Sequence, residues 1–379
     1  MMGEPSALPR PAAPPVADVN LPARDGDDDM PRVEVTARRA VLVTLFVILS
    51  LAALYLLLPQ LAGLEETWNR INEGKPGWIF AALVFQVLSL GGYIAMFQST
   101  CVPPSGEPRQ RIQWSESYQI TMAGVAATRL FAAGGAGGVA LTAWALRRAG
   151  MDRREVATRL FAFLVLLYGV YMAALLIAGI GLRVGLFPGR APFAMTVVPA
   201  IFAGVVILLF LAMTLVPADF ERRLGGWARG PRHPRMARWL TRAATVPATV
   251  SSGMRVALGE LRSPSPGLLG AIAWWAFNVA VLWAAFHAFG DAPPLAVVVM
   301  GYFVGMLGNL LPLPGGIGGV DGGMIGAFIA FGVPGGLAIV AVLVYRGFSF
   351  WLPTIPGVVA YLQLRRTVHR WREEPAPAA

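Results

Sequence analysis

Long apolar runs separated by short polar segments dominate this chain. The first covers residues 40–58, and its 19 residues form a helix long enough for a hydrocarbon core of about 30 Å, at a rise of about 1.5 Å per residue. Five further runs of similar character lie at residues 77–97, 160–182, 193–216, 267–289 and 336–363. The pattern predicts an all-α polytopic membrane protein with six full spans.

Two other apolar regions, residues 117–146 and 294–333, are each interrupted by a glycine cluster. Both clusters follow the pattern GGxGGV, and Gly134 in the first lies 181 positions before Gly315 in the second. Irregular backbone at membrane depth leaves unpaired amides unless it is buried in protein or lines a wet cavity. We therefore predict a Gly-broken re-entrant helical hairpin in each region.

The charged loops give each span a direction. Segment 218–264 carries nine Arg against three acidic residues, and Arg-rich sequence also follows the first hairpin and the last span. Such loops stay in the cytoplasm, whereas the acidic-to-neutral loop 59–76 fits the outside. Under this assignment both termini are cytoplasmic. We interpret residues 1–37 as a disordered cytoplasmic tail and residues 367–379 as a second cytoplasmic tail.

This topology makes the chain an inverted repeat. Residues 38–185 and 190–366 each contain two spans, a hairpin and a further span, and the two halves have opposite sidedness. Glycine-interrupted segments at matching positions of inverted halves indicate the midplane binding site of a transporter.

Composition agrees with a membrane protein and argues against other classes. Of 379 residues, 56% are hydrophobic and 14% charged, and the mean hydropathy is +0.60, which is typical of a polytopic membrane protein. The net charge of +10 does not indicate nucleic-acid binding, because the basic residues lie between the spans. With one cysteine and three dispersed histidines, we expect no metal site and no cofactor.

The glycine clusters and the polar residues near them are the candidate substrate-binding site. Glycine leaves backbone N–H groups uncovered, and N–H groups at a half-helix N-terminus attract an anion such as a lipid phosphate. Glycine clusters also permit close helix packing, which is the structural alternative. The candidates are Gly134, Gly135, Gly137, Gly138, Pro314, Gly315, Gly316, Gly318, Gly319, Asp321, Arg346, Arg129 and Asn309.

Asp321 is the acid within the second glycine cluster. An ionised carboxylate at the bilayer centre costs at least about 2.5–3.5 kcal/mol, so Asp321 requires a partner, and the candidates are Arg129 and Arg346. Three roles remain open for it: a proton-coupling group, a counter-ion for Arg346, or the N-cap of a helix that starts at Gly322.

The stretch PLPGGIGGVDGG, the following FGVP and the segment LVYRGFSFWLPTIPG resemble the lysylphosphatidylglycerol synthase transmembrane family, also called flippase-like or UPF0104. The resemblance covers about residues 40–366. Asp321 stands where the family motif PGGxGxxE has Glu, Arg346 matches the family's Arg, and the first hairpin departs from the family's motif. The resemblance implies movement of a phospholipid or polyisoprenoid-type lipid between leaflets. Since little chain follows residue 366 for the soluble domain of the family's synthases, we expect no enzymatic activity.

Two functions follow as hypotheses. The first is a lipid translocator of the bacterial inner membrane, whose partner is a lipid with an anionic or phosphate-bearing headgroup. The second is a non-transporting accessory protein that binds a lipid-synthesis or envelope enzyme through the basic segment 218–264.

Overall fold

The computed structural model describes residues 74–130, 136–214, 250–260, 265–310, 316 and 318–373. The predicted tail 1–37, the predicted span 40–58 and most of the basic segment 218–264 lie outside the described residues, as does the end of the C-terminal tail. All regular structure within the described part of the chain is helical.

Five described helices are long and apolar enough to cross a membrane. They confirm that the chain is an all-helical, multi-pass membrane protein, and each overlaps one of the predicted apolar runs. These helices are α3 (Pro76–Cys101), α7 (Arg153–Arg183), α8 (Phe193–Thr214), α11 (Pro266–Phe289) and the run formed by α14 (Gly335–Arg346) and α15 (Leu352–Glu373).

The two glycine-containing regions form pairs of shorter helices. The first pair is α5 (Trp114–Leu130) with α6 (Ala136–Arg148), and the second is α12 (Leu295–Met306) with α13 (Gly319–Ala330). The longest has 17 residues and extends about 25 Å, which is less than a hydrocarbon core of about 30 Å. The helices of each pair pack on each other, as the hairpin prediction requires.

Glycine allows the helices of each pair to approach closely. A Cβ atom on Gly138 in α6 would lie 2.6 Å from the carbonyl oxygen of Gly124 in α5. In the second pair, a Cβ atom on Gly305 would lie 2.7 Å from the backbone nitrogen of Met324. Gly138 therefore serves helix packing, the structural alternative to a binding role for the glycine clusters.

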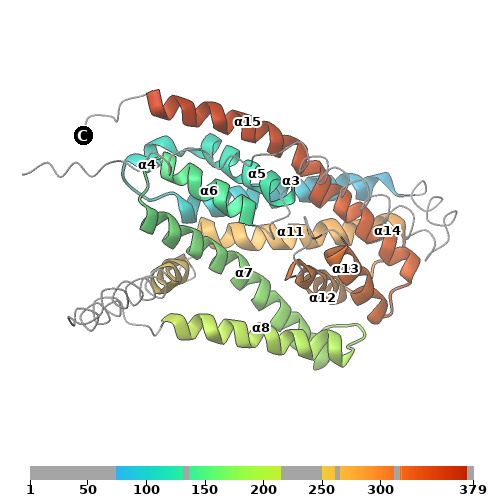
Figure 1. Ribbon diagram of the computed structural model, residues 1–379. Coiled ribbons are helices and arrows are strands. Elements are labelled where there is room, and N and C mark those ends of the chain that lie inside the picture. Colours follow the sequence, from blue (N-terminus) through green and yellow to red (C-terminus); the bar gives the residue numbers. More distant parts are fainter. Residues whose placement is uncertain are drawn as a thin grey trace, which may run out of the picture.

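Helices α3 and α11 form the most extensively packed pair in the described chain. They cross at Gly92 and Gly270, where a Cβ atom on Gly270 would lie 2.5 Å from the carbonyl oxygen of Gly92. Figure 1 shows α11 running through the middle of the bundle, with α15 on one side and α7 and α8 on the other. Helix α5 packs on α15, and α12 packs on α7.

The last apolar run is not one uninterrupted α-helix. A π-helical turn, Gly347–Trp351, separates α14 from α15. In a continuous α-helix, the carbonyl of Ser349 would accept the N–H of the residue four positions later, but that residue is Pro353, which has none. The carbonyl of Ser349 therefore accepts no α-helical hydrogen bond, and it lies within the π-helical turn.

Candidate functional site

Asp321 forms a buried ion pair with Arg346. Arg346 Nε donates to Asp321 Oδ1, and Arg346 Nη2 lies 3.5 Å from Oδ2. Asp321 is only 4% exposed, so the pair offsets the charge that burial would otherwise leave uncompensated. Of the two predicted partners, the described structure brings Arg346 to Asp321.

The same carboxylate stabilises the start of α13. Asp321 Oδ2 accepts the backbone N–H of Gly318 at 2.9 Å, and Gly318 has a φ of +83°, which favours glycine. The prediction of a helix beginning at Gly322 is wrong. The helix begins three residues earlier, at Gly319, because Gly318 makes the turn before it and Asp321 reaches back to Gly318. Counter-ion and helix-capping contacts are thus made by one side chain.

Arg129, in the last turn of α5, contacts the π-helical turn of the opposite sequence half. Its Nη2 donates to the carbonyl oxygen of Ser349 at 2.6 Å, and its Nη1 donates to that of Phe350 at 2.8 Å. Arg129 therefore donates to the Ser349 carbonyl in place of the backbone N–H that Pro353 lacks. The guanidinium carbons of Arg129 and Arg346 lie 5.5 Å and 5.0 Å from the centroid of the Phe350 ring, within the range of a cation–π contact.

Both arginines line a cavity of about 510 Å³, which we call the central cavity. Its lining comes from both sequence halves. It comprises Tyr93, Val125, Thr128, Arg129, Tyr168, Tyr171, Met172, Phe202, Trp274, Trp275, Asn278, Tyr302, Met306, Leu307, Asn309, Gly316, Tyr345, Arg346, Ser349 and Phe350. This volume lies within the range of small-molecule binding sites, about 300–1,000 Å³.

The electrostatic character of the central cavity follows from its two cations. Among the lining residues that the structure describes, only Arg129 and Arg346 are charged. Asp321 compensates Arg346, whereas Arg129 contacts neutral carbonyls, and no carboxylate of the described chain lies within ion-pair distance of it. The wall therefore has a net positive charge, which attracts an anion.

Aromatic side chains make up much of the remaining wall and are anchored to the backbone. Tyr171 donates its hydroxyl to the carbonyl of Phe303 at 2.6 Å, and Trp275 Nε1 donates to the carbonyl of Leu167 at 2.7 Å. These bonds hold the rings in fixed orientations. The sequence does not reveal this aromatic wall, because hydropathy cannot distinguish a tryptophan at a membrane interface from one that faces a cavity.

Asn278 belongs to a short polar network on the same wall. Its Nδ2 donates to Ser89 Oγ at 2.6 Å and to the carbonyl of Trp274 at 2.9 Å, and Ser89 Oγ donates to that carbonyl at 3.0 Å. The network joins α3 to α11 beside the cavity. Within the described residues, no group of three or more His, Cys, Asp or Glu gathers as a metal site.

The predicted site residues divide into four groups. Arg129, Arg346, Asn309 and Gly316 line the central cavity, and a Cβ atom on Gly316 would lie 2.5 Å from Asn309 Oδ1. Near the cavity, Asp321 holds Arg346, and Gly318 and Gly319 form the start of α13. In α6, Gly137 and Gly138 belong to the hairpin and do not line the central cavity. Four predicted residues lie outside the described chain: Gly134, Gly135, Pro314 and Gly315.

Comparison with known proteins supports the resemblance stated from the motifs. A family model described as the lysylphosphatidylglycerol synthase TM region matches residues 41–357. A UPF0104 membrane protein from Methanothermobacter thermautotrophicus is 26% identical over 339 residues, which are 85% of this chain and 94% of the relative. A UPF0104 membrane protein from Methanocaldococcus jannaschii is 32% identical over 95 residues, 25% of this chain and 28% of the relative. Both relatives are archaeal, and neither name describes an activity.

Proposed function

This chain belongs to the lysylphosphatidylglycerol synthase TM region family, and we propose that it is a translocator that moves a phosphate-bearing lipid between membrane leaflets. One observation carries the proposal: a central cavity of about 510 Å³ is bordered by an arginine that no described carboxylate compensates. A charge of this kind is expensive inside a membrane and marks a substrate pathway. A phosphodiester supplies the matching single negative charge, whether the lipid is a phospholipid or of the polyisoprenoid type.

We further propose that the architecture is an inverted repeat of spans and re-entrant hairpins. In support, each helix pair packs on the last span of the other half, since α5 contacts α15 and α12 contacts α7. Helices α3 and α11 occupy matching places and cross at glycines. A substrate site between such halves is accessible to each leaflet in turn as the halves rock against each other.

Arg129 is suited to couple substrate binding to this movement. Its guanidinium donates to the carbonyls of Ser349 and Phe350. Phosphate oxygens are stronger acceptors than neutral carbonyls, so a bound phosphate would attract these donors away from the π-helical turn. The proposed consequence is a looser joint between α14 and α15 when the lipid headgroup is present.

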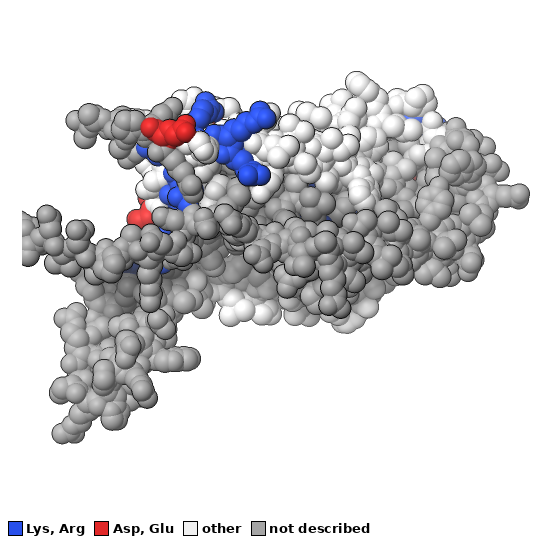
Figure 2. Space-filling model, turned by 45° about the horizontal axis from the view of Figure 1, so that its top comes forward, with Lys and Arg blue, Asp and Glu red and all other residues white. Residues whose placement is uncertain are grey.

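The proposed location is the bacterial inner membrane, with both termini in the cytoplasm. Exposed arginines gather at one end of the described molecule (Figure 2), where α6 and α15 end and α7 begins. A basic end of this kind supports a cytoplasmic assignment.

Reconstitution into liposomes tests the proposal. Purified protein should accelerate the exchange of fluorescent phospholipids between leaflets, and Arg129→Gln should slow it at least about tenfold, because a charge-assisted contact is lost. Arg129→Lys should retain part of the rate, since it keeps the charge. Arg159→Gln is the matched control, because Arg159 pairs with Glu155 at 3.4 Å and does not line the central cavity. Exchange no faster than in empty vesicles, across several lipid classes, would contradict the proposal.

A further inference from the structure

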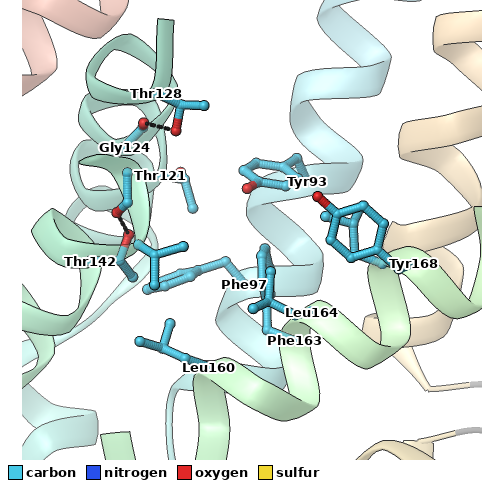
Figure 3. Close-up of a pocket in the computed structure, with 13 residues that line it drawn as sticks. Tyr93, Phe97, Thr121, Gly124, Thr128, Thr142, Leu160, Phe163, Leu164 and Tyr168 are labelled. Carbon is cyan, nitrogen blue, oxygen red and sulfur yellow. Dashed lines mark hydrogen bonds between the residues drawn. The ribbon is translucent and has the colours of Figure 1, made fainter. Parts of the chain in front are cut away.

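A second, smaller cavity of about 140 Å³ adjoins the central cavity. It lies between the α5–α6 pair and helices α3 and α7 (Figure 3). Tyr93, Thr128 and Tyr168 line both cavities, so the two spaces share part of their walls. We call the smaller space the threonine cavity, after Thr121, Thr128 and Thr142 in its wall. Since a single water needs about 10–15 Å³ of such space, it accommodates several waters or a small organic group.

Each of the three threonine hydroxyls donates to the backbone carbonyl four residues earlier in its own helix. Thr121 Oγ1 donates to the carbonyl of Ser117 at 2.6 Å, Thr128 Oγ1 to that of Gly124 at 2.9 Å, and Thr142 Oγ1 to that of Gly138 at 2.8 Å. A hydroxyl has one proton to donate and two lone pairs to accept with. Because each hydroxyl proton is donated to the preceding helical turn, the threonine oxygens can only accept hydrogen bonds from a group in the cavity. The wall therefore accepts hydrogen bonds from a ligand.

The opposite wall is largely aromatic, and Tyr93 and Tyr168 add a hydroxyl group each. Figure 3 shows Tyr93, Phe97, Phe163 and Tyr168 on the side facing the threonines, and none of the described residues that line the threonine cavity is charged. Aromatic faces carry partial negative charge and attract cations. The threonine oxygens and the aromatic faces thus suit a group that donates hydrogen bonds or carries positive charge, and a tyrosine hydroxyl can accept from the same group. This preference is the opposite of that of the anion-attracting arginines in the central cavity.

We propose that the threonine cavity is a subsite for the distal end of the lipid headgroup, an inference that rests on the proposed function. The phosphate occupies the central cavity at Arg129, and the group esterified to it enters the threonine cavity. Arg129 and Thr128 are neighbours on α5, so one headgroup reaches both. The substrate class is a phosphodiester lipid whose headgroup ends in a hydrogen-bond donor, either a primary ammonium or a hydroxyl.

A series of lipids with identical acyl chains tests the subsite. Phosphatidylethanolamine presents an ammonium, phosphatidylglycerol presents hydroxyls, phosphatidylcholine presents a positive charge without a donor, and phosphatidylmethanol presents neither. The wild-type protein should exchange at least one of the first two about fivefold faster than phosphatidylmethanol, as expected for one hydrogen bond. The preferred member identifies the donor as ammonium or hydroxyl.

Substitutions assign this preference to the threonines. Thr128→Val and Thr142→Val keep the side-chain shape and remove the acceptor, so each should abolish most of the preference, whereas Thr142→Ser should retain it. Thr196→Val is the control, because Thr196 Oγ1 makes the same kind of bond, to the carbonyl of Pro192 at 2.9 Å, and lines neither cavity.

The outcomes separate the two proposals. Equal exchange of all four lipids by the wild type, equal rates for phosphatidylcholine and the donor lipids, or a preference that survives both valine substitutions would overturn the subsite. If no lipid is exchanged at all, the translocation proposal fails. The subsite is then decided by the binding of the same four lipids in detergent, measured by isothermal titration calorimetry. Loss of preferential binding in the valine variants supports it, and unchanged binding overturns it.

Discussion

Removing the charge of Asp321 while keeping its shape should destabilise the protein through Arg346. The informative substitution is Asp321→Asn. Its amide oxygen still accepts the N–H of Gly318, which the carboxylate accepts at 2.9 Å, so the start of α13 keeps its hydrogen bond. What is lost is the counter-charge of a guanidinium whose side chain is only 13% exposed.

The size of the effect follows from burial. Breaking a buried ion pair by removing one partner costs about 3–5 kcal/mol, because the other charge is left uncompensated. Asp321→Ala should cost about 1 kcal/mol more, since it also leaves the N–H of Gly318 without its acceptor. The double variant Asp321→Asn with Arg346→Gln contains no isolated charge, and its stability should return to within about 2 kcal/mol of the wild type.

Unfolding in mixed micelles, with helix content followed by circular dichroism, measures these differences. The expected order of stability is wild type, double variant, Asp321→Asn and then Asp321→Ala. If Asp321→Asn unfolds within about 1 kcal/mol of the wild type, or if the double variant is no more stable than Asp321→Asn, then the carboxylate does not act by compensating Arg346 and the reasoning is refuted.

Three further predictions concern packing, the π-helical turn and the basic segment. Gly138→Ala should lower stability by about 1–3 kcal/mol because the new Cβ meets backbone at 2.6 Å, whereas Gly169→Ala, with open space at its Cβ position, should not; thermal unfolding compares them. Pro353→Ala should supply the missing backbone N–H, so Arg129→Gln should cost about 1 kcal/mol less in that background, as a double-mutant cycle would measure. Replacing the arginines of segment 218–264 with glutamine should leave lipid exchange in liposomes unchanged, because the proposed substrate contacts lie in the central cavity; loss of exchange would contradict that assignment.

Much of the fold could be predicted, because the length of an apolar run and the glycines within it determine the local helix without reference to distant segments. Each described span overlaps an apolar run, and the two helix pairs coincide with the glycine-interrupted regions. The pairing of Asp321 with Arg346 could also be anticipated, because a lone carboxylate in apolar sequence needs a nearby cation. The start of α13 was placed three residues late, since nothing in the pattern showed which glycine of the cluster adopts positive φ.

The site could be predicted only in part, because it depends on contacts between distant segments. Arg129 was a candidate, but its bonds to Ser349 and Phe350 join residues about 220 positions apart. Pro353 was the available signal, since a proline within an apolar helix frees a carbonyl that must find another donor. The threonine cavity had no such signal, because threonines in membrane helices ordinarily bond to their own backbone.

The most direct test of the central claim is the position of a lipid phosphate in an electron cryomicroscopy structure of the protein bound to a phosphodiester lipid. Phosphate density is expected in the central cavity within hydrogen-bonding distance of the Arg129 guanidinium. A lipid phosphate found only on the outer surface, with Arg129 still bonded to Ser349 and Phe350 and the cavity without a headgroup, would contradict it.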